Sequence, residues 1–144
     1  MLRRILPHAH FLARRVEVSA ALPDGSTRCL LRISSWDFNW QGDYAYRQPV
    51  LLPKGTTLSM EIEYDNTADN PRNPNQPPKE VRYGVESGDE MAEVWMQVLP
   101  RTPEGAGLLE RAMQPKVLSS GVAFNRYLLR LDPGNALHCP ALCA

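Results

Sequence analysis

Apolar and polar residues alternate along much of the first hundred positions, with the period of two that is typical of half-buried β-strands. Residues 58–64 show it most regularly, since Leu58, Met60, Ile62 and Tyr64 alternate with Ser59, Glu61 and Glu63. Residues 90–99 repeat it, with Ala92, Val94, Met96 and Val98 opposite Met91, Glu93, Trp95 and Gln97. A further strand is expected over residues 8–22, with His8, His10, Leu12, Arg14, Val16 and Val18 on one face.

Turn residues separate these stretches. Leu22-Pro23-Asp24-Gly25-Ser26 predicts a hairpin turn into a strand over residues 28–33, because proline presets φ and glycine accepts a positive φ. Pro53-Lys54-Gly55-Thr56 predicts another turn, after an extended stretch at 44–52. The pattern favours an all-β fold, an antiparallel jelly-roll-like β-sandwich, with any helix confined to the chain after Pro100.

Beyond Pro100 the pattern changes. Residues 103–113 predict a short helix with Thr102 as its N-cap. Residues 117–131 suit a second helix or a strand, and the sequence leaves both open. We therefore expect a β domain over residues 1–100 and a short helical or irregular extension over residues 101–144, of unknown role.

Residues 65–79 are the one long segment that cannot form a ladder, because they are dense in Pro, Asn and Asp. The carboxylates of Asp65, Asp69 and Glu80 could bind calcium, but their spacing departs from the EF-hand pattern. A loop held by its own hydrogen bonds is the favoured interpretation.

Composition narrows the function classes. The 144 residues suffice for one ordinary domain, and 16 basic residues balance 16 acidic ones, which disfavours binding to nucleic acid. No stretch approaches the roughly 18 apolar residues of a membrane span. Residues 1–7 carry two positive charges but lack the apolar run of a signal peptide. Three cysteines form no disulfide framework, and no catalytic triad or phosphate-binding loop is present.

His8 and His10 are the first candidates for chemistry, since residues two apart in a strand project to the same side. Two imidazoles on one face can bind a metal, although on spacing alone a pair of polar surface histidines is the favoured interpretation. His138 with Cys139 and Cys143 is a weaker metal or redox candidate in the C-terminal tail. The aromatic corner at residues 36–40, with Trp36, Phe38 and Trp40, is expected to be core rather than a stacking site.

Six motifs occur in the order seen in one family. They are His8-Ala9-His10, Leu22-Pro23-Asp24-Gly25-Ser26, Trp36-Asp37-Phe38-Asn39-Trp40-Gln41, Leu52-Pro53-Lys54-Gly55-Thr56, Asp65-Asn66-Thr67-Ala68-Asp69-Asn70-Pro71 and Asp89-Glu90-Met91. In this order they resemble the C-terminal domain of type II, ascorbate-dependent copper monooxygenases, the family of peptidylglycine α-hydroxylating monooxygenase and dopamine β-monooxygenase. The resemblance extends over residues 6–99 and points to a bacterial-type relative.

The resemblance implies one copper ion held by His8, His10 and Met91, at which dioxygen is activated with ascorbate or another reductant. Imidazole nitrogens suit copper and a thioether favours Cu(I). Trp95, Glu93 and Glu90 become candidates for substrate contact or for support of the ligands. The family also implies a periplasmic or extracellular location.

This sequence departs from the family's pattern at several positions, and these differences bear on the expected substrate and activity. The peptide-hydroxylating members carry an arginine at the position of Leu6 and a tyrosine at that of Trp95, so a peptide ending in glycine is not the expected substrate. The family's electron-transfer copper domain and the first strands of this domain have no counterpart here, which predicts an open sheet edge that needs a cover. Residues 117–131 could fold back to supply it, but a partner polypeptide is the favoured interpretation. Two functions stay open. The full parent protein is a copper-dependent monooxygenase, or this chain is a non-catalytic copper-binding or structural subunit of a larger complex.

Overall fold

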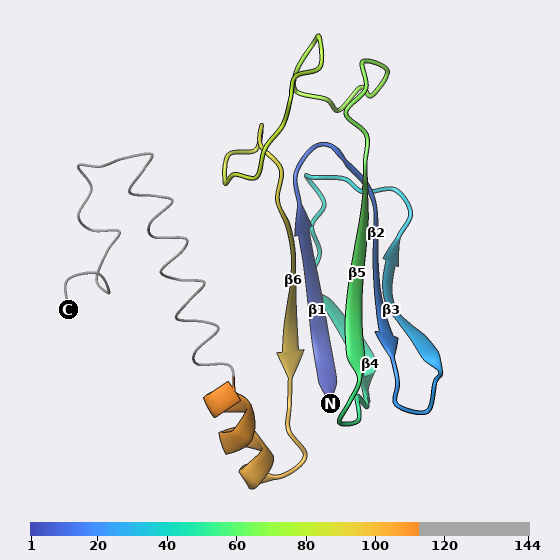
Figure 1. Ribbon diagram of the computed structural model, residues 1–144, viewed down its shortest axis with the longest axis vertical. Coiled ribbons are helices and arrows are strands. Elements are labelled where there is room, and N and C mark those ends of the chain that lie inside the picture. Colours follow the sequence, from blue (N-terminus) through green and yellow to red (C-terminus); the bar gives the residue numbers. More distant parts are fainter. Residues whose placement is uncertain (113–144) are drawn as a thin grey trace, which may run out of the picture. The chain divides into compact units, whose positions relative to one another are not determined.

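The computed structural model describes residues 1–112 (Figure 1). The chain divides into two units, Met1–Leu99 and a second that begins at Pro100. Strands make up the first unit: β1 Leu2–Ala9, β2 Ala13–Ala21, β3 Thr27–Ile33, β4 Tyr44–Val50, β5 Thr57–Tyr64 and β6 Ala92–Val98. No helix occurs within the described part of this unit, as the sequence predicted.

The strands form two three-stranded sheets, ordered β4-β1-β6 and β3-β2-β5, and every neighbouring pair is antiparallel. The predicted all-β, sandwich-like fold is confirmed. β1 and β2 are the central strands of their sheets, so the two strands joined by residues 10–12 lie in different layers. This connection carries His10.

The core lies between the sheets and has two parts. Leu2 and Ile5 of β1 pack with Val18 and Ala20 of β2 and with Leu30 of β3. The second part is made of Ala9, Ala13, Val16 and Trp36, all at most 1% exposed. Trp36 therefore confirms the expectation that the aromatic corner contributes to the core, whereas Trp40 is 79% exposed and does not.

The expectation of one strand over residues 8–22 is wrong. β1 ends at Ala9, the Ala13 N–H bonds the His10 carbonyl at 3.4 Å, and β2 starts at Ala13 in the other sheet. The physical reason is that the crossing is itself buried at Ala9, His10, Leu12 and Ala13, so it needs apolar residues rather than Gly, Pro or Asn. A register shift between Ala13 and Arg15 also separates exposed Arg14 from buried Val16.

The predicted turns are confirmed. Gly25 has φ +85° in the β2–β3 hairpin, where the Leu22 N–H bonds the Ser26 carbonyl at 2.8 Å. Gly55 has φ +90°, and the Thr56 N–H bonds the Pro53 carbonyl at 3.1 Å. Both positions use the left-handed conformation that glycine accepts without a steric penalty.

The segment at 65–79 contains no strand and is held by its own hydrogen bonds, as expected. Asn70 is fully buried, and its amide donates to the Asp65 carbonyl at 2.7 Å. Both carboxylate oxygens of Asp65 are engaged, one by Thr67 and the other by Arg14 at 3.1 Å. The polar side chains of this loop thus satisfy one another.

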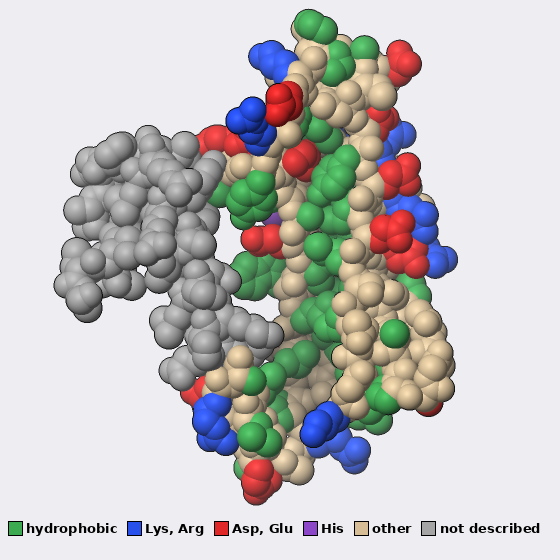
Figure 2. Space-filling model, viewed as in Figure 1, with side chains coloured by type: hydrophobic (Ala, Val, Ile, Leu, Met, Phe, Trp, Pro, Cys, Tyr) green, Lys and Arg blue, Asp and Glu red, His purple; other side chains and the backbone are tan. Residues whose placement is uncertain are grey.

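β5 is a strand as predicted, but its apolar face is less buried than its alternation suggested. Leu58, Met60 and Tyr64 are 45%, 44% and 41% exposed, although they lie opposite buried positions of β2. The reason is that β5 lies at the end of its sheet in the described part of the chain. Figure 2 shows hydrophobic side chains running lengthwise along the side of the sandwich where β5 lies.

In the second unit, residues 103–112 form the predicted helix. Thr102 caps it, because its hydroxyl oxygen accepts the Gly105 N–H at 3.2 Å. The open question of residues 117–131 and the candidate group of His138, Cys139 and Cys143 lie outside the described residues. No helix among residues 1–112 is long and apolar enough to cross a membrane.

Candidate metal centre

His8 lies near the end of β1 and contacts two other segments. Its Nδ1 lies 2.6 Å from Oε1 of Gln41, which precedes β4, and its Nε2 lies 3.2 Å from Sδ of Met91. The antiparallel register explains the second contact, because His8 pairs with Glu93 and Ala9 with Ala92. Continuing this register by one residue on each strand places Met91 opposite His10, and therefore diagonally across from His8. The structure therefore brings together His8, His10 and Met91.

His10 follows directly after β1 and is 3% exposed. Its ring centroid is 5.2 Å from that of His8, and the two rings are nearly perpendicular at 85°. Its Nδ1 lies 3.0 Å from the main-chain oxygen of Asp89. Phe38 covers the ring edge-on, with centroids 6.0 Å apart.

The hydrogen-bond partners indicate which tautomer each imidazole adopts in its neutral form. A carbonyl oxygen only accepts, so the neutral rings of His8 and His10 donate through Nδ1–H and keep a lone pair on Nε2. At His8 that lone pair faces a thioether sulfur, which carries no proton. Two electron-rich atoms 3.2 Å apart have the spacing of two ligands on one metal ion, which is about 3–4 Å. The donor set of imidazole and thioether fits copper.

Glu90 lies beside this cluster but contacts main chain rather than a ring. Its Oε1 accepts the Leu12 N–H at 3.0 Å, which fixes the segment before Met91 to the turn after His10. Burial raises the pKa of Glu90 above its usual value, and the bond from Leu12 opposes that shift. Its Oε2 is buried with no hydrogen-bond partner in the described residues.

Glu93 and Trp95 lie on the opposite face of β6 from the core. The Trp95 indole N–H donates to Glu93 Oε2 at 3.0 Å, and Trp95 is 64% exposed. Glu93 pairs with His8 in the register and Trp95 with Leu6, so all four side chains share one face of the sheet. Trp95 therefore lies two positions from the His8–Glu93 pair in the register, in the next pair on the same face.

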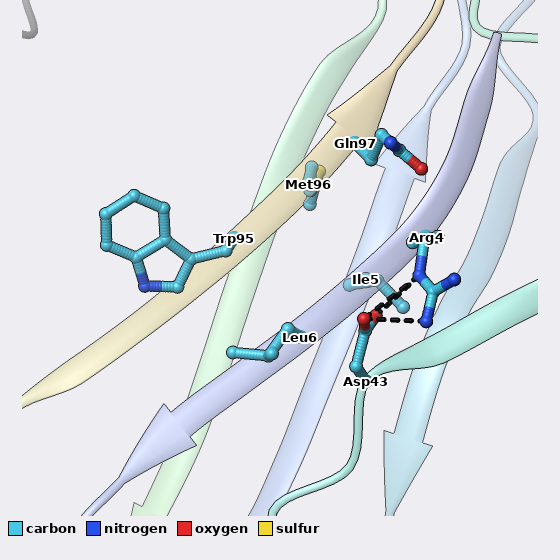
Figure 3. A pocket seen from close by; sticks show the side chains of 7 residues that line it. All are labelled: Arg4, Ile5, Leu6, Asp43, Trp95, Met96 and Gln97. Atoms are coloured by element: carbon cyan, nitrogen blue, oxygen red, sulfur yellow. Dashed lines mark hydrogen bonds and ion pairs between the residues drawn. The ribbon is translucent and has the colours of Figure 1, made fainter.

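A shallow groove of about 400 Å³ runs along this face (Figure 3). Leu6 and Trp95 project from neighbouring strands, and Arg4 lies at one end. Asp43 holds Arg4 by three contacts of 2.7 to 3.0 Å. The guanidinium is thus already paired, and the rest of the groove offers mostly apolar surface.

Gln41, Asp89 and Phe38 were not singled out by sequence reasoning as site residues. Gln41 and Phe38 belong to the aromatic motif at residues 36–41, and Asp89 to the Asp-Glu-Met motif. Position within a motif was the available signal, but a long-range contact such as His8–Gln41 cannot be read from spacing.

The fold and the cluster define an all-β sandwich with a group of two imidazoles and one thioether at one end of its central strand. Residues 1–112 contain no group of three or more His, Cys, Asp and Glu side chains placed to hold a metal ion, so this candidate depends on the methionine. Comparison with known protein families, with curated proteins and with solved structures found no match. The copper monooxygenase resemblance therefore stands as a hypothesis on the residues themselves.

Proposed function

We propose that this chain is a copper-binding β domain that holds one copper ion through His8 Nε2, His10 Nε2 and Met91 Sδ. The observation that carries the proposal is the 3.2 Å approach of His8 Nε2 to Met91 Sδ, an imidazole nitrogen and a thioether sulfur at the spacing of two ligands on one ion. Three protein ligands leave a coordination position for dioxygen. We further propose that the domain is the oxygen-activating half of a copper monooxygenase.

A bound copper ion would supply one-electron chemistry with dioxygen, and the protein would supply orientation. Asp89 and Gln41 hold the two rings through Nδ1, so that the Nε2 lone pairs are available. The groove on the sheet face shared with His8 suits an uncharged, largely apolar substrate, because Leu6 and Trp95 line it and Asp43 neutralises Arg4. A peptide carboxylate would find no unpaired cation among these lining residues.

Met91 gives the most direct test of the ligand set. Replacing it by leucine removes the soft donor while keeping an apolar side chain, so Cu(I) affinity should fall by about tenfold or more, and Cu(II) affinity by less. Competition titration with a Cu(I) chelator measures the change. Met96→Leu, on the core side of the same strand, is the matched control and should bind as the unmodified chain does. Equal Cu(I) affinity in the two variants would remove Met91 from the ligand set.

Hydroxylation of a C–H bond by dioxygen consumes two electrons and two protons and yields the alcohol and water. One copper ion cycles a single electron, so a catalytic form needs a second electron, which we propose is supplied by ascorbate in the isolated chain and by a partner polypeptide or domain with its own redox centre in the assembled protein. The exposed apolar side chains of β5 give such a partner a surface to cover.

Oxygen uptake separates the enzyme from a purely copper-binding module. With ascorbate and small aromatic substrates, the copper-loaded chain should consume dioxygen above the rate of free copper, and the His8→Ala variant should not. The product is the second readout, since a hydroxylated substrate must appear in proportion to the oxygen consumed. Uptake at the free-copper rate with every substrate would favour the alternative, a copper-binding or structural subunit.

A further inference from the structure

Gln41 is not one of the proposed metal ligands, yet its side chain contacts His8. It lies in the connection before β4 and is half-buried, yet its side-chain amide bonds at both ends. Its Nε2 donates to the Phe38 carbonyl at 2.9 Å, and its Oε1 lies 2.6 Å from His8 Nδ1. Because a main-chain carbonyl can only accept, the amide cannot turn over without losing the first bond and placing its own carbonyl oxygen against that of Phe38.

This fixed amide determines the proton position on His8. With Oε1 facing the ring, Nδ1 must carry the proton, and Nε2 keeps its lone pair directed at Met91 Sδ, 3.2 Å away. In the other tautomer Nδ1 and Oε1 would be two acceptors at 2.6 Å, which is repulsive. The Nε2–H would then donate to the sulfur, and both donor atoms of the cluster would be occupied by one hydrogen bond.

We propose that Gln41 is a positioning residue that locks His8 in the Nδ1–H tautomer and so presents a free Nε2 lone pair before any metal binds. Two successive hydrogen bonds carry this effect, because the main-chain carbonyl of Phe38 orients the Gln41 amide and the amide orients the His8 ring. His10 reaches the same state differently, through the main-chain oxygen of Asp89. The consequence for metal binding rests on the proposed function, whereas the tautomer itself does not.

Nitrogen NMR of the metal-free, full-length chain tests the lock. Long-range proton–nitrogen spectra distinguish the two neutral tautomers, because a ring nitrogen without a proton resonates far from an N–H nitrogen. The spectra are recorded about two pH units above the ordinary imidazole pKa of about 6.5, and rings are assigned with His8→Gln and His10→Gln variants. We expect His8 and His10 both as Nδ1–H. A predominant Nε2–H tautomer at His8 overturns the proposal without any variant at Gln41.

The Gln41→Leu variant removes the acceptor while filling similar space. His8 should then shift to the Nε2–H tautomer or a mixture, with His10 unchanged as the internal control, because its acceptor is main chain. Gln41→Glu retains an acceptor oxygen and should restore Nδ1–H at His8. An unchanged His8 tautomer in Gln41→Leu would show that another group sets it and would overturn the proposal.

Copper affinity supplies the functional readout. Loss of such a hydrogen-bond partner to a ligand typically weakens metal binding about 10–100-fold, so Gln41→Leu should bind Cu(I) more weakly by that factor, and Gln41→Glu should recover most of it. If the His8 tautomer depends on Gln41 but the chain binds no copper, this inference stands and the proposed function is rejected. If the chain binds copper but the His8 tautomer does not depend on Gln41, the proposed function stands and this inference is rejected.

Discussion

Replacing His8 and His10 together by alanine should reduce bound copper from about one ion per chain to near zero. The double substitution removes both nitrogen donors and leaves Met91 alone, and a single thioether does not retain the ion against dialysis. Loss of a supporting hydrogen bond already weakens a metal site by about 10–100-fold, so the loss of two ligands should exceed that range. Metal analysis after loading with copper and dialysis measures the stoichiometry.

Two controls make this result specific. His138→Ala removes the remaining histidine of the chain, which is outside the proposed ligand set, and should leave copper unchanged. Circular dichroism of the double variant should retain the β-sheet signal, because the core clusters contain neither histidine. Full copper retention by a folded His8→Ala/His10→Ala chain would reject the metal assignment.

Replacing Trp36 by alanine should lower the free energy of unfolding by about 3–5 kcal/mol, the usual cost of removing a large buried aromatic side chain. Trp36 is 1% exposed and packs with Ala9, Ala13 and Val16. Its main chain also joins the sandwich, since its N–H bonds the Arg14 carbonyl at 2.8 Å and its carbonyl accepts from Arg72. Chemical denaturation gives the change.

Two further tryptophan variants separate the causes. Trp40→Ala, at a side chain that is 79% exposed, should change stability by no more than about 0.5 kcal/mol. Trp36→Phe should cost far less than Trp36→Ala, because it keeps most of the apolar volume and removes an indole N–H that has no hydrogen-bond partner in the described residues. Equal losses in Trp36→Ala and Trp40→Ala would contradict the core role of Trp36.

The Trp36→Ala variant also links the core to the candidate metal centre. Ala9, which lies between the two histidines, is fully buried in the same cluster as Trp36. A cavity at Trp36 should therefore loosen the strand end that carries His8 and His10, and copper affinity should fall together with stability. Trp40→Ala should leave copper affinity unchanged.

The strand alternation and the turn chemistry predicted most of the fold. The regular stretches at residues 58–64 and 92–98 are strands, and Gly25 and Gly55 adopt the positive φ that their turns require. These features are local, because side-chain period and glycine conformation depend on neighbouring residues alone. The capped helix after Thr102 was predictable for the same reason.

Tertiary structure alone decided where the chain changes sheets and what surrounds each imidazole. The crossing after Ala9 is buried, so it carries the same apolar residues as a continuous strand and gives no turn signal. The exposure of Leu58 and Met60 follows from the place of β5 in its sheet, which alternation does not encode. His8, Gln41 and Met91 meet through contacts that span 33 and 83 positions of sequence. Sequence indicated the candidate ligands, and only sheet register and packing determined that His8 Nε2 and Met91 Sδ face one another with His10 beside them.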